Sequence, residues 1–190
     1  MRTLVVVALA PEAAHVPQGL DVVIIGLGKT HAATSVTREL ARGDVAQVVN
    51  IGTAGALRPG LSGTYEPSVV INHDMNAAVI RTLGYDPQER LELGTGDSTV
   101  LATGDVFVTD PVVRDRLAVQ AQLVDMEGYA VAWACREFGV PVRLLKHVSD
   151  AADESALAWD EVVDASARAL ATRLEQVLDA PVPAQVLRPG

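Results

Sequence analysis

The sequence lacks several features that small secreted or metal-dependent domains depend on. It has one cysteine, Cys135, in 190 residues, so neither an internal disulfide nor a cysteine-based zinc site can form. Aromatic residues are only 4% of the chain, so the core has to be built from Ala, Val and Leu. No apolar run approaches the roughly 18 residues of a membrane span. We therefore expect a globular protein with no membrane association and no bound metal.

The chain is also short of positive charge. It carries 15 Lys and Arg against 24 Asp and Glu, a net charge of −9. Phosphate backbones would repel such a protein, so we expect no nucleic-acid partner. Hydrophobic residues make up 49% of the chain and charged residues 21%, which is typical of a folded protein. The length predicts one domain over residues 1–180, followed by a proline-containing tail over residues 181–190.

The amino terminus resembles a short signal peptide. Arg2 precedes an apolar stretch over residues 3–9. That stretch is at the lower limit for a signal, and a single arginine is a weak charged region. A buried first strand explains the same run of Val and Leu, so we expect a cytoplasmic protein.

Strand-like and helix-like segments alternate along the chain. Residues 74–97 have only a weak pattern. The predicted strands cover residues 3–9, 20–25, 45–51, 69–72, 99–103, 106–108, 122–125 and 142–148. The predicted helices cover residues 29–42, 111–121, 127–138 and 160–178. This order predicts an α/β sheet covered on both faces, with ligands at the carboxyl ends of its strands.

Two glycine-containing segments follow predicted strands. Gly26 and Gly28 suggest a dinucleotide-binding loop, but His31 stands where the fingerprint needs its third glycine. There is no phosphate-loop spacing either, so a tight strand-to-helix turn is the simpler interpretation. Residues 52–55, Gly-Thr-Ala-Gly, are predicted to form a second turn whose small side chains would let backbone amides approach a ligand.

Four carboxylates, at Glu12, Glu127, Asp150 and Asp153, fall just past apolar strands. In a cleft, such groups can act as acids or bases. Each could instead cap a helix or face solvent, and for Asp153 we favour a helix-start or loop role. His147 adds a loosely ligand-like spacing to Asp150 and Asp153, but without further His or Cys nearby a metal site is not expected.

Four short strings, in the same order along the chain, resemble the nucleoside phosphorylase family. They are Asn50–Leu57 (NIGTAGAL), Thr103–Val108 (TGDVFV), Val124–Ala132 (VDMEGYAVA) and Val148–Asp153 (VSDAAD). Within that family, the chain is most similar to the methylthioadenosine/S-adenosylhomocysteine nucleosidases. The resemblance implies a three-layer α/β fold with a central mixed sheet flanked by helices.

The resemblance also implies roles for individual residues. Glu127 would bind the ribose 2′ and 3′ hydroxyls, and Met126 would lie under the sugar. Asp150 would give a proton to purine N7, and Ser149 would hold that carboxylate. Glu12 would activate water.

Further members of the pocket are implied in the same way. Thr53 falls where a hydroxyl helps to place the water, and Lys146 where an arginine often stands nearby. Phe107 and the backbone of Val108 match the wall of the base pocket. Trp159 falls where an aromatic often closes the 5′ side.

The sequence departs from the family in three places. The stretch before Gly26 is shorter than in typical members, and residues 74–97 match poorly, which leaves the 5′ substituent and strict homodimerisation open. Where phosphorylases carry arginines for phosphate, this chain has Ala10–Glu12 and Asn50–Ile51. The lack of these arginines favours water over phosphate as the nucleophile.

The resulting expectation is a purine nucleoside hydrolase that needs no cofactor and acts on adenine nucleosides with an apolar 5′ group, such as methylthioadenosine or S-adenosylhomocysteine. The alternatives are a futalosine hydrolase, a purine nucleoside phosphorylase and a catalytically inactive nucleoside-binding protein. The resemblance implies a homodimer, and we expect its apolar patch around the helix and loop that follow Gly55.

Overall fold

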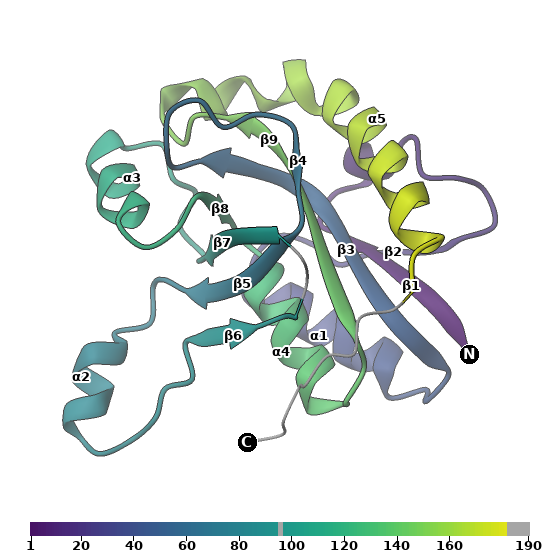
Figure 1. The fold of residues 1–190 in the computed structure, drawn as a ribbon, viewed down its shortest axis with the longest axis horizontal. Coiled ribbons are helices and arrows are strands. Elements are labelled where there is room, and N and C mark those ends of the chain that lie inside the picture. The colour runs from purple at the N-terminus through teal and green to yellow at the C-terminus, as the bar shows by residue number, and fades with distance from the viewer. Residues whose placement is uncertain (95–96, 182–190) are drawn as a thin grey trace.

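The computed structural model describes residues 1–94 and 97–181, so residues 182–190 of the expected tail lie outside the described part. Its strands form one mixed sheet in the order β2-β1-β3-β8-β7-β5-β6, with β9 paired to β3 and β4 (Figure 1). The strands are β1 Arg2–Val7, β2 Asp21–Ile24, β3 Val45–Ala56, β4 Thr64–Tyr65, β5 Pro67–Asn72, β6 Arg90–Glu92, β7 Asp97–Thr103, β8 Leu123–Asp125 and β9 Val142–Asp150. The helices are α1 Lys29–Leu40, α2 Ala77–Thr82, α3 Pro111–Ala118, α4 Gly128–Glu137 and α5 Trp159–Leu178, with short 3-10 helices at Ala10–Ala13 and Glu154–Ala158.

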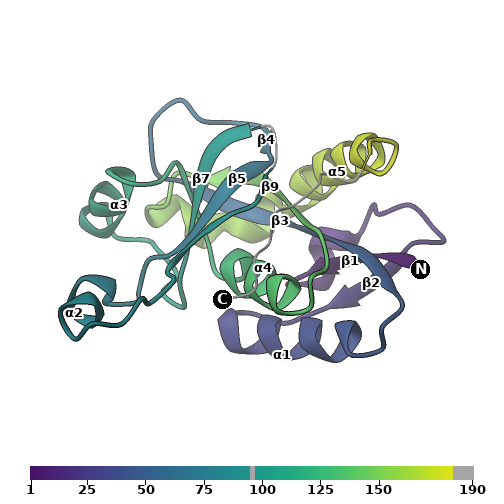
Figure 2. The ribbon, with the colours of Figure 1, turned by 60° about the horizontal axis from the view of Figure 1, so that its bottom comes forward.

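Helices cover both faces of the sheet, which makes three layers. Helices α1 and α4 lie on one face and α5 on the other (Figure 2). Strand β1 shows why its sequence is apolar throughout: Leu4 and Val6 pack toward α1 and α4, while Val5 and Val7 pack toward α5. The predicted fold class, a mixed sheet flanked by helices, is confirmed.

Strand β3 is the central element, and it corrects one prediction. Residues 52–55 are not a turn but the second half of this strand. Gly52 and Thr53 pair with Lys146 and His147 of β9, and Gly55 pairs with Val124 of β8. Pairing with β9 along residues 52–55, and with β8 as well at Gly55, keeps the chain extended despite its glycines. The small residues therefore lie in the sheet and form part of the pocket floor.

Two other segments differ from expectation. Residues 106–108 are not a strand: Val106 and Phe107 are half exposed in a loop beyond β7. The weakly patterned segment 74–97 contains α2, β6 and the beginning of β7.

The apolar dimer patch was expected around a helix and loop that follow Gly55. No helix follows Gly55 directly, because a loop leads from β3 to β4. The described residues there carry none of the large exposed apolar side chains that a dimer patch would need.

Asp153 lies at a helix start, as expected, and Asp110 does the same for α3. The Asp110 side chain accepts a hydrogen bond from Val112 N and caps α3 (2.8 Å). The Asp153 side chain likewise caps the second 3-10 helix through Ser155 N (2.9 Å). Cys135 is fully buried. Among the described helices, none has the length and apolarity needed to cross a membrane.

Candidate active site

A pocket of about 430 Å³ opens at the carboxyl ends of the central strands. Its walls come from the segments that follow β1, β7 and β8 and from the later parts of β3 and β9. All the residues predicted for the site line it, although they are spread over almost 150 positions of the chain. They are Glu12, Thr53, Phe107, Val108, Met126, Glu127, Lys146, Ser149, Asp150 and Trp159.

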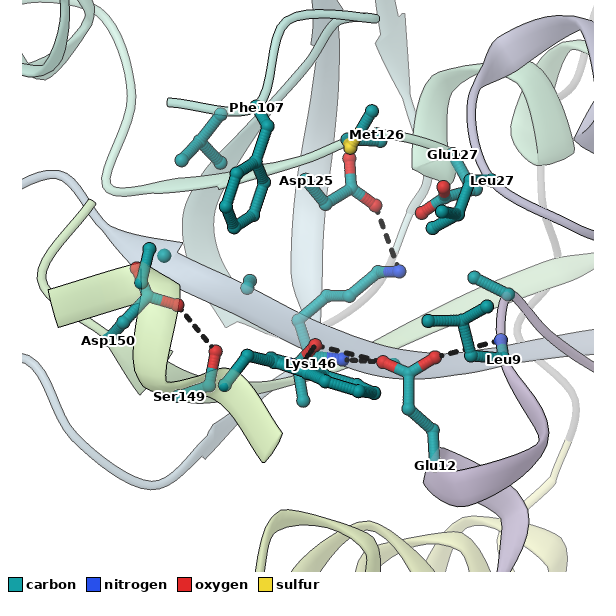
Figure 3. A pocket seen from close by; sticks show the side chains of 18 of the residues that line it. Leu9, Glu12, Leu27, Phe107, Asp125, Met126, Glu127, Lys146, Ser149 and Asp150 are labelled. Carbon is teal, nitrogen blue, oxygen red and sulfur yellow. Dashed lines mark hydrogen bonds and ion pairs between the residues drawn. The ribbon is translucent and has the colours of Figure 1, made fainter. Parts of the chain in front are cut away.

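The Glu12 carboxylate is held by three donors in one corner of the pocket (Figure 3). Its Oε2 accepts a hydrogen bond from Leu9 N at 3.1 Å, and its Oε1 accepts bonds from Thr53 N at 2.7 Å and Thr53 Oγ1 at 2.9 Å. The Trp159 indole N–H donates to the same Thr53 oxygen at 3.0 Å. Glu12 is buried, so these bonds hold its carboxylate in one orientation.

Asp150 lies at the other end of the pocket, at the end of β9 (Figure 3). The Ser149 hydroxyl donates to Asp150 Oδ2 at 2.7 Å, and Ala152 N donates to Oδ1 at 2.8 Å. Gly55 of β3 lies against this carboxylate: a Cβ at that position would be 3.0 Å from Asp150 Oδ1. The absence of a side chain at residue 55 therefore helps to place Asp150.

A buried ion pair lies beneath the pocket. Lys146 is 1% exposed, and its Nζ is 2.9 Å from Asp125 Oδ2. Burial opposes the charge of Lys146, but the carboxylates of Asp125, Glu127 and Glu12 outweigh burial and raise the pKa of Lys146 above its ordinary value. Asp125 also accepts bonds from Gly128 N at 2.8 Å and from Thr103 Oγ1 at 2.5 Å. The ammonium group is therefore a fixed positive charge among carboxylates.

Gly52 explains how Lys146 comes close to Glu12. A Cβ on Gly52 would lie 3.3 Å from Lys146 Nζ and 3.4 Å from Glu12 Oε1. Any larger side chain would stand between the ammonium and the carboxylate. Figure 3 shows Lys146 reaching from β9 toward Asp125, with Glu12 on its other side.

Glu127 lies at the start of α4 but does not cap that helix through its side chain. Its Oε1 instead accepts a hydrogen bond from Gly28 N, at 2.8 Å, from the loop before α1. Burial and the neighbouring Asp125 carboxylate raise the pKa of Glu127 to about 7, against the opposing effects of Lys146 and Gly28 N–H. The group therefore changes charge near neutral pH, which a helix cap alone would not require.

The mouth of the pocket is apolar. Four of its side chains are 50% to 74% exposed although they are large and hydrophobic: Leu27, Val106, Phe107 and Leu157. Asp160 is the charged residue beside them. Among the described residues that line the pocket, Lys146 is the only cation. Within residues 1–94 and 97–181, no group of three or more His, Cys, Asp or Glu is placed to hold a metal ion.

Comparison with known proteins identifies the family. The family model described as "Phosphorylase superfamily" matches residues 89–182. A 5′-methylthioadenosine/S-adenosylhomocysteine nucleosidase of Marinomonas is 30% identical over 189 residues, which cover 85% of this chain and 82% of that protein. The chain belongs to the phosphorylase superfamily. Its resemblance to that family is thus confirmed.

Further known proteins are similar to this chain. An aminodeoxyfutalosine nucleosidase of Helicobacter pylori is 29% identical over 177 residues, 80% of this chain and 77% of that protein. A crystal structure of a Helicobacter pylori 5′-methylthioadenosine/S-adenosylhomocysteine nucleosidase has a TM-score of 0.84 at 24% identity, covering 95% of this chain and 99% of that one. A futalosine hydrolase of the same organism also has a TM-score of 0.84 at 24% identity, covering 95% of this chain and 98% of that one. These structures support the fold.

Two residues that support the candidate active site, Asp125 and Gly28, were not predicted from the sequence. Asp125 stands directly before Met126 and Glu127. The next strand contains a single lysine, Lys146, and a buried lysine needs a carboxylate partner, which could have pointed to Asp125. Gly28 carried no such signal, since its amide contacts a side chain 99 residues away. The loop over residues 26–28, whose glycines suggested a dinucleotide site, instead donates a hydrogen bond to the Glu127 carboxylate.

Proposed function

We propose that the protein is a purine nucleosidase, an N-glycosyl hydrolase that releases the base from a nucleoside with water. The observation that carries the proposal is the convergence of three carboxylates, Glu12, Glu127 and Asp150, on one pocket from three distant segments. Cleavage of this bond needs a general acid at the purine, a group that binds the sugar and a general base that activates water. The family to which the chain belongs, and the nucleosidases among its relatives, support the same reaction.

Asp150 would protonate the leaving purine at N7. Breaking the bond builds negative charge on the base, and protonation makes it a neutral leaving group, which lowers the barrier directly. The hydroxyl of Ser149 and the backbone N–H of Ala152 hold the Asp150 carboxyl in place. Phe107 and Val108 would form the wall against which the base stacks.

Glu127 and Met126 would bind the ribose. A carboxylate bonded to the 2′ and 3′ hydroxyls orients the sugar, and its negative charge favours the positive charge that develops on the ring in the transition state. On this proposal Glu127 acts in its ionised form, so kcat/KM rises with pH through about 7, the pKa of this group.

Glu12 would deprotonate the attacking water, with the Thr53 hydroxyl helping to place it. Phosphate is a poor alternative nucleophile here, because binding a dianion needs free cations. The one cation that lines the described pocket, Lys146, is buried and paired with Asp125. The neighbouring carboxylates would repel phosphate, which disfavours a purine nucleoside phosphorylase.

The apolar mouth favours a nucleoside with an uncharged 5′ group, as in methylthioadenosine, or a thioether that extends out of the pocket, as in S-adenosylhomocysteine. Asp160 at the mouth would disfavour an anionic 5′ group. Similarity to the Helicobacter pylori aminodeoxyfutalosine nucleosidase makes futalosine-type nucleosides the second candidate substrates. We further propose a cytoplasmic homodimer in which the apolar mouth meets the second copy.

The test is to incubate the protein with a panel of purine nucleosides, with and without phosphate, and to identify the sugar product. We expect free base and the free 5′-substituted ribose at the same rate in both conditions. Glu12→Gln should abolish release and leave nucleoside affinity largely intact. Strict phosphate dependence with a ribose-1-phosphate product would make the protein a phosphorylase, and tight binding without base release would make it a nucleoside-binding protein.

A further inference from the structure

Two loops that line the pocket are tied together by one lysine. Leu27 comes from the loop before α1, and residues 106–108 come from the loop after β7. Lys29 Nζ donates to Asn72 Oδ1 at 2.9 Å and to Asp74 Oδ1, and it lies 3.7 Å from Asp105 Oδ2. We call Lys29, Asn72, Asp74 and Asp105 the Lys29 cluster.

Asp105 closes the cluster through the backbone as well as through charge. Its Oδ1 accepts a hydrogen bond from Lys29 N at 2.8 Å, and its own N–H donates to Asp74 Oδ2 at 2.8 Å. The first amide of α1, the end of β5 and the loop after β7 are thus joined in one network. Separate movement of either loop would break several of these bonds together.

Gly28 lies between this cluster and the pocket. Its φ is +83°, a conformation that favours glycine, and a Cβ there would be 2.8 Å from Asp105 Oδ1. The backbone therefore turns so that successive amides point to different carboxylates. Lys29 N–H faces Asp105, and Gly28 N–H faces Glu127 Oε1.

We propose that the Lys29 cluster positions Glu127, by holding the loop over residues 26–28 so that Gly28 N–H stays on Glu127 Oε1. This inference rests on the proposed function, in which Glu127 binds the ribose. The charged groups that face Glu127 are Asp125 from β8, Lys146 from β9 and Glu12 from the first 3-10 helix. Since two of these three are carboxylates, the neutral Gly28 donor helps to keep Glu127 ionised and oriented.

Two variants break the cluster from different sides: Lys29→Met removes the ammonium, and Asp105→Ala removes the carboxylate. Asp110→Ala is the matched control, because Asp110 also caps a helix through its side chain but lies outside the pocket lining. We expect kcat/KM for base release to fall about tenfold in Lys29→Met and Asp105→Ala, as for loss of a bond to a charged acceptor, and to be unchanged in Asp110→Ala.

A double-mutant cycle separates positioning from a merely structural role. In a Glu127→Gln background the same two changes should lower kcat/KM less than about twofold, since their effect passes through the Glu127 carboxylate. Full additivity, an equal loss in both backgrounds, would overturn the proposal. Thermal unfolding of each variant shows whether it is folded, and either cluster variant alone suffices for the cycle.

A second readout does not depend on turnover. The pKa of the Glu127 carboxyl, followed by carbon NMR, should rise in Lys29→Met and Asp105→Ala and stay in place in Asp110→Ala, because Gly28 N–H lowers it in the intact loop. An unchanged Glu127 titration in both cluster variants would refute the positioning role. If the wild-type protein releases no base, the proposed function fails while this titration still tests the cluster.

Discussion

At the scale of single residues, the ionised form of Glu127 that the proposed reaction needs is also the form that destabilises the folded protein. Its pKa lies at about 7 in the folded protein against an ordinary value of 4.5, so between these values the folded state binds the proton more tightly than the unfolded chain does. The stabilisation that this proton provides is fully present below about pH 4.5 and is lost as the pH rises through 7. Its size is on the order of 3 kcal/mol.

Glu127→Gln should therefore raise Tm at pH 8, by about 6–12 °C, and leave it almost unchanged at pH 4.5. The amide removes one of the negative charges crowded around Lys146, which keeps its partner Asp125. Thermal scans of both proteins across this pH range measure the difference. A gain of equal size at all pH values would show that the ionisation of Glu127 is not its cause. The same variant should lose most base release, because the transition state needs the charge.

Asp150 is expected to act on the base and not on binding. Asp150→Asn keeps the shape of the side chain and one acceptor oxygen, for Ala152 N–H, while its NH2 group can donate to the Ser149 hydroxyl, which then accepts. The amide cannot deliver a proton to N7. Base release should fall by about 10²–10⁴-fold, while the dissociation constant for the nucleoside changes little. Single-turnover base release and equilibrium binding on the same preparation measure the two quantities. Near-wild-type release by Asp150→Asn would exclude the N7 role.

At the scale of elements, β3 makes the clearest prediction, since its glycines lie against the reacting groups. An alanine at Gly55 would bring a Cβ to 3.0 Å from Asp150 Oδ1 and from Ala152 Cβ. The strand tolerates alanine, but the carboxyl has to shift. Relief of this contact needs a shift of a few tenths of an ångström. Since a misplacement of about 1 Å can cost 10²-fold in rate, kcat in Gly55→Ala should fall by a smaller factor, on the order of several-fold. The melting temperature and strand content of the variant should change little. A variant that is unfolded would show instead that its loss of activity comes from a damaged fold and not from a displaced Asp150.

Elements also show what the sequence could predict. Long segments with helical or continuous apolar patterns, such as α1, α5 and β9, were predicted to within a few residues, because both faces of the sheet impose the pattern. Residues 52–55 were mistaken for a turn because their composition is that of a turn, while pairing with β9 decides the outcome. Most of the site residues lie in the four strings that carry the resemblance to the family. Glu12, Lys146 and Trp159 lie outside those strings, and the same resemblance implied them. Contacts such as Gly28 with Glu127 join distant segments and leave no local pattern.

At the scale of the whole molecule, the exposed apolar mouth predicts association. Leu157 is 74% exposed beside the pocket, and Val119, at the end of α3, is 83% exposed away from it. If two copies meet through the mouth, Leu157→Asp should yield monomers, whereas the matched change Val119→Asp should leave a dimer. Sedimentation at micromolar concentration distinguishes the two. A wild-type protein that sediments only as a monomer would contradict the homodimer.

The two lysines of the chain differ in how accessible they are to amine-reactive reagents. Lys146 is sealed beneath the pocket, whereas the Lys29 side chain is 19% exposed. An acylating label can react with Lys146 only when its ion pair with Asp125 opens toward the pocket, so the rate at which its peptide gains mass measures how often that pair opens. Immobilisation through amines, by contrast, would use the amino terminus and Lys29. A support coupled at the terminus alone would leave both loops of the pocket untouched.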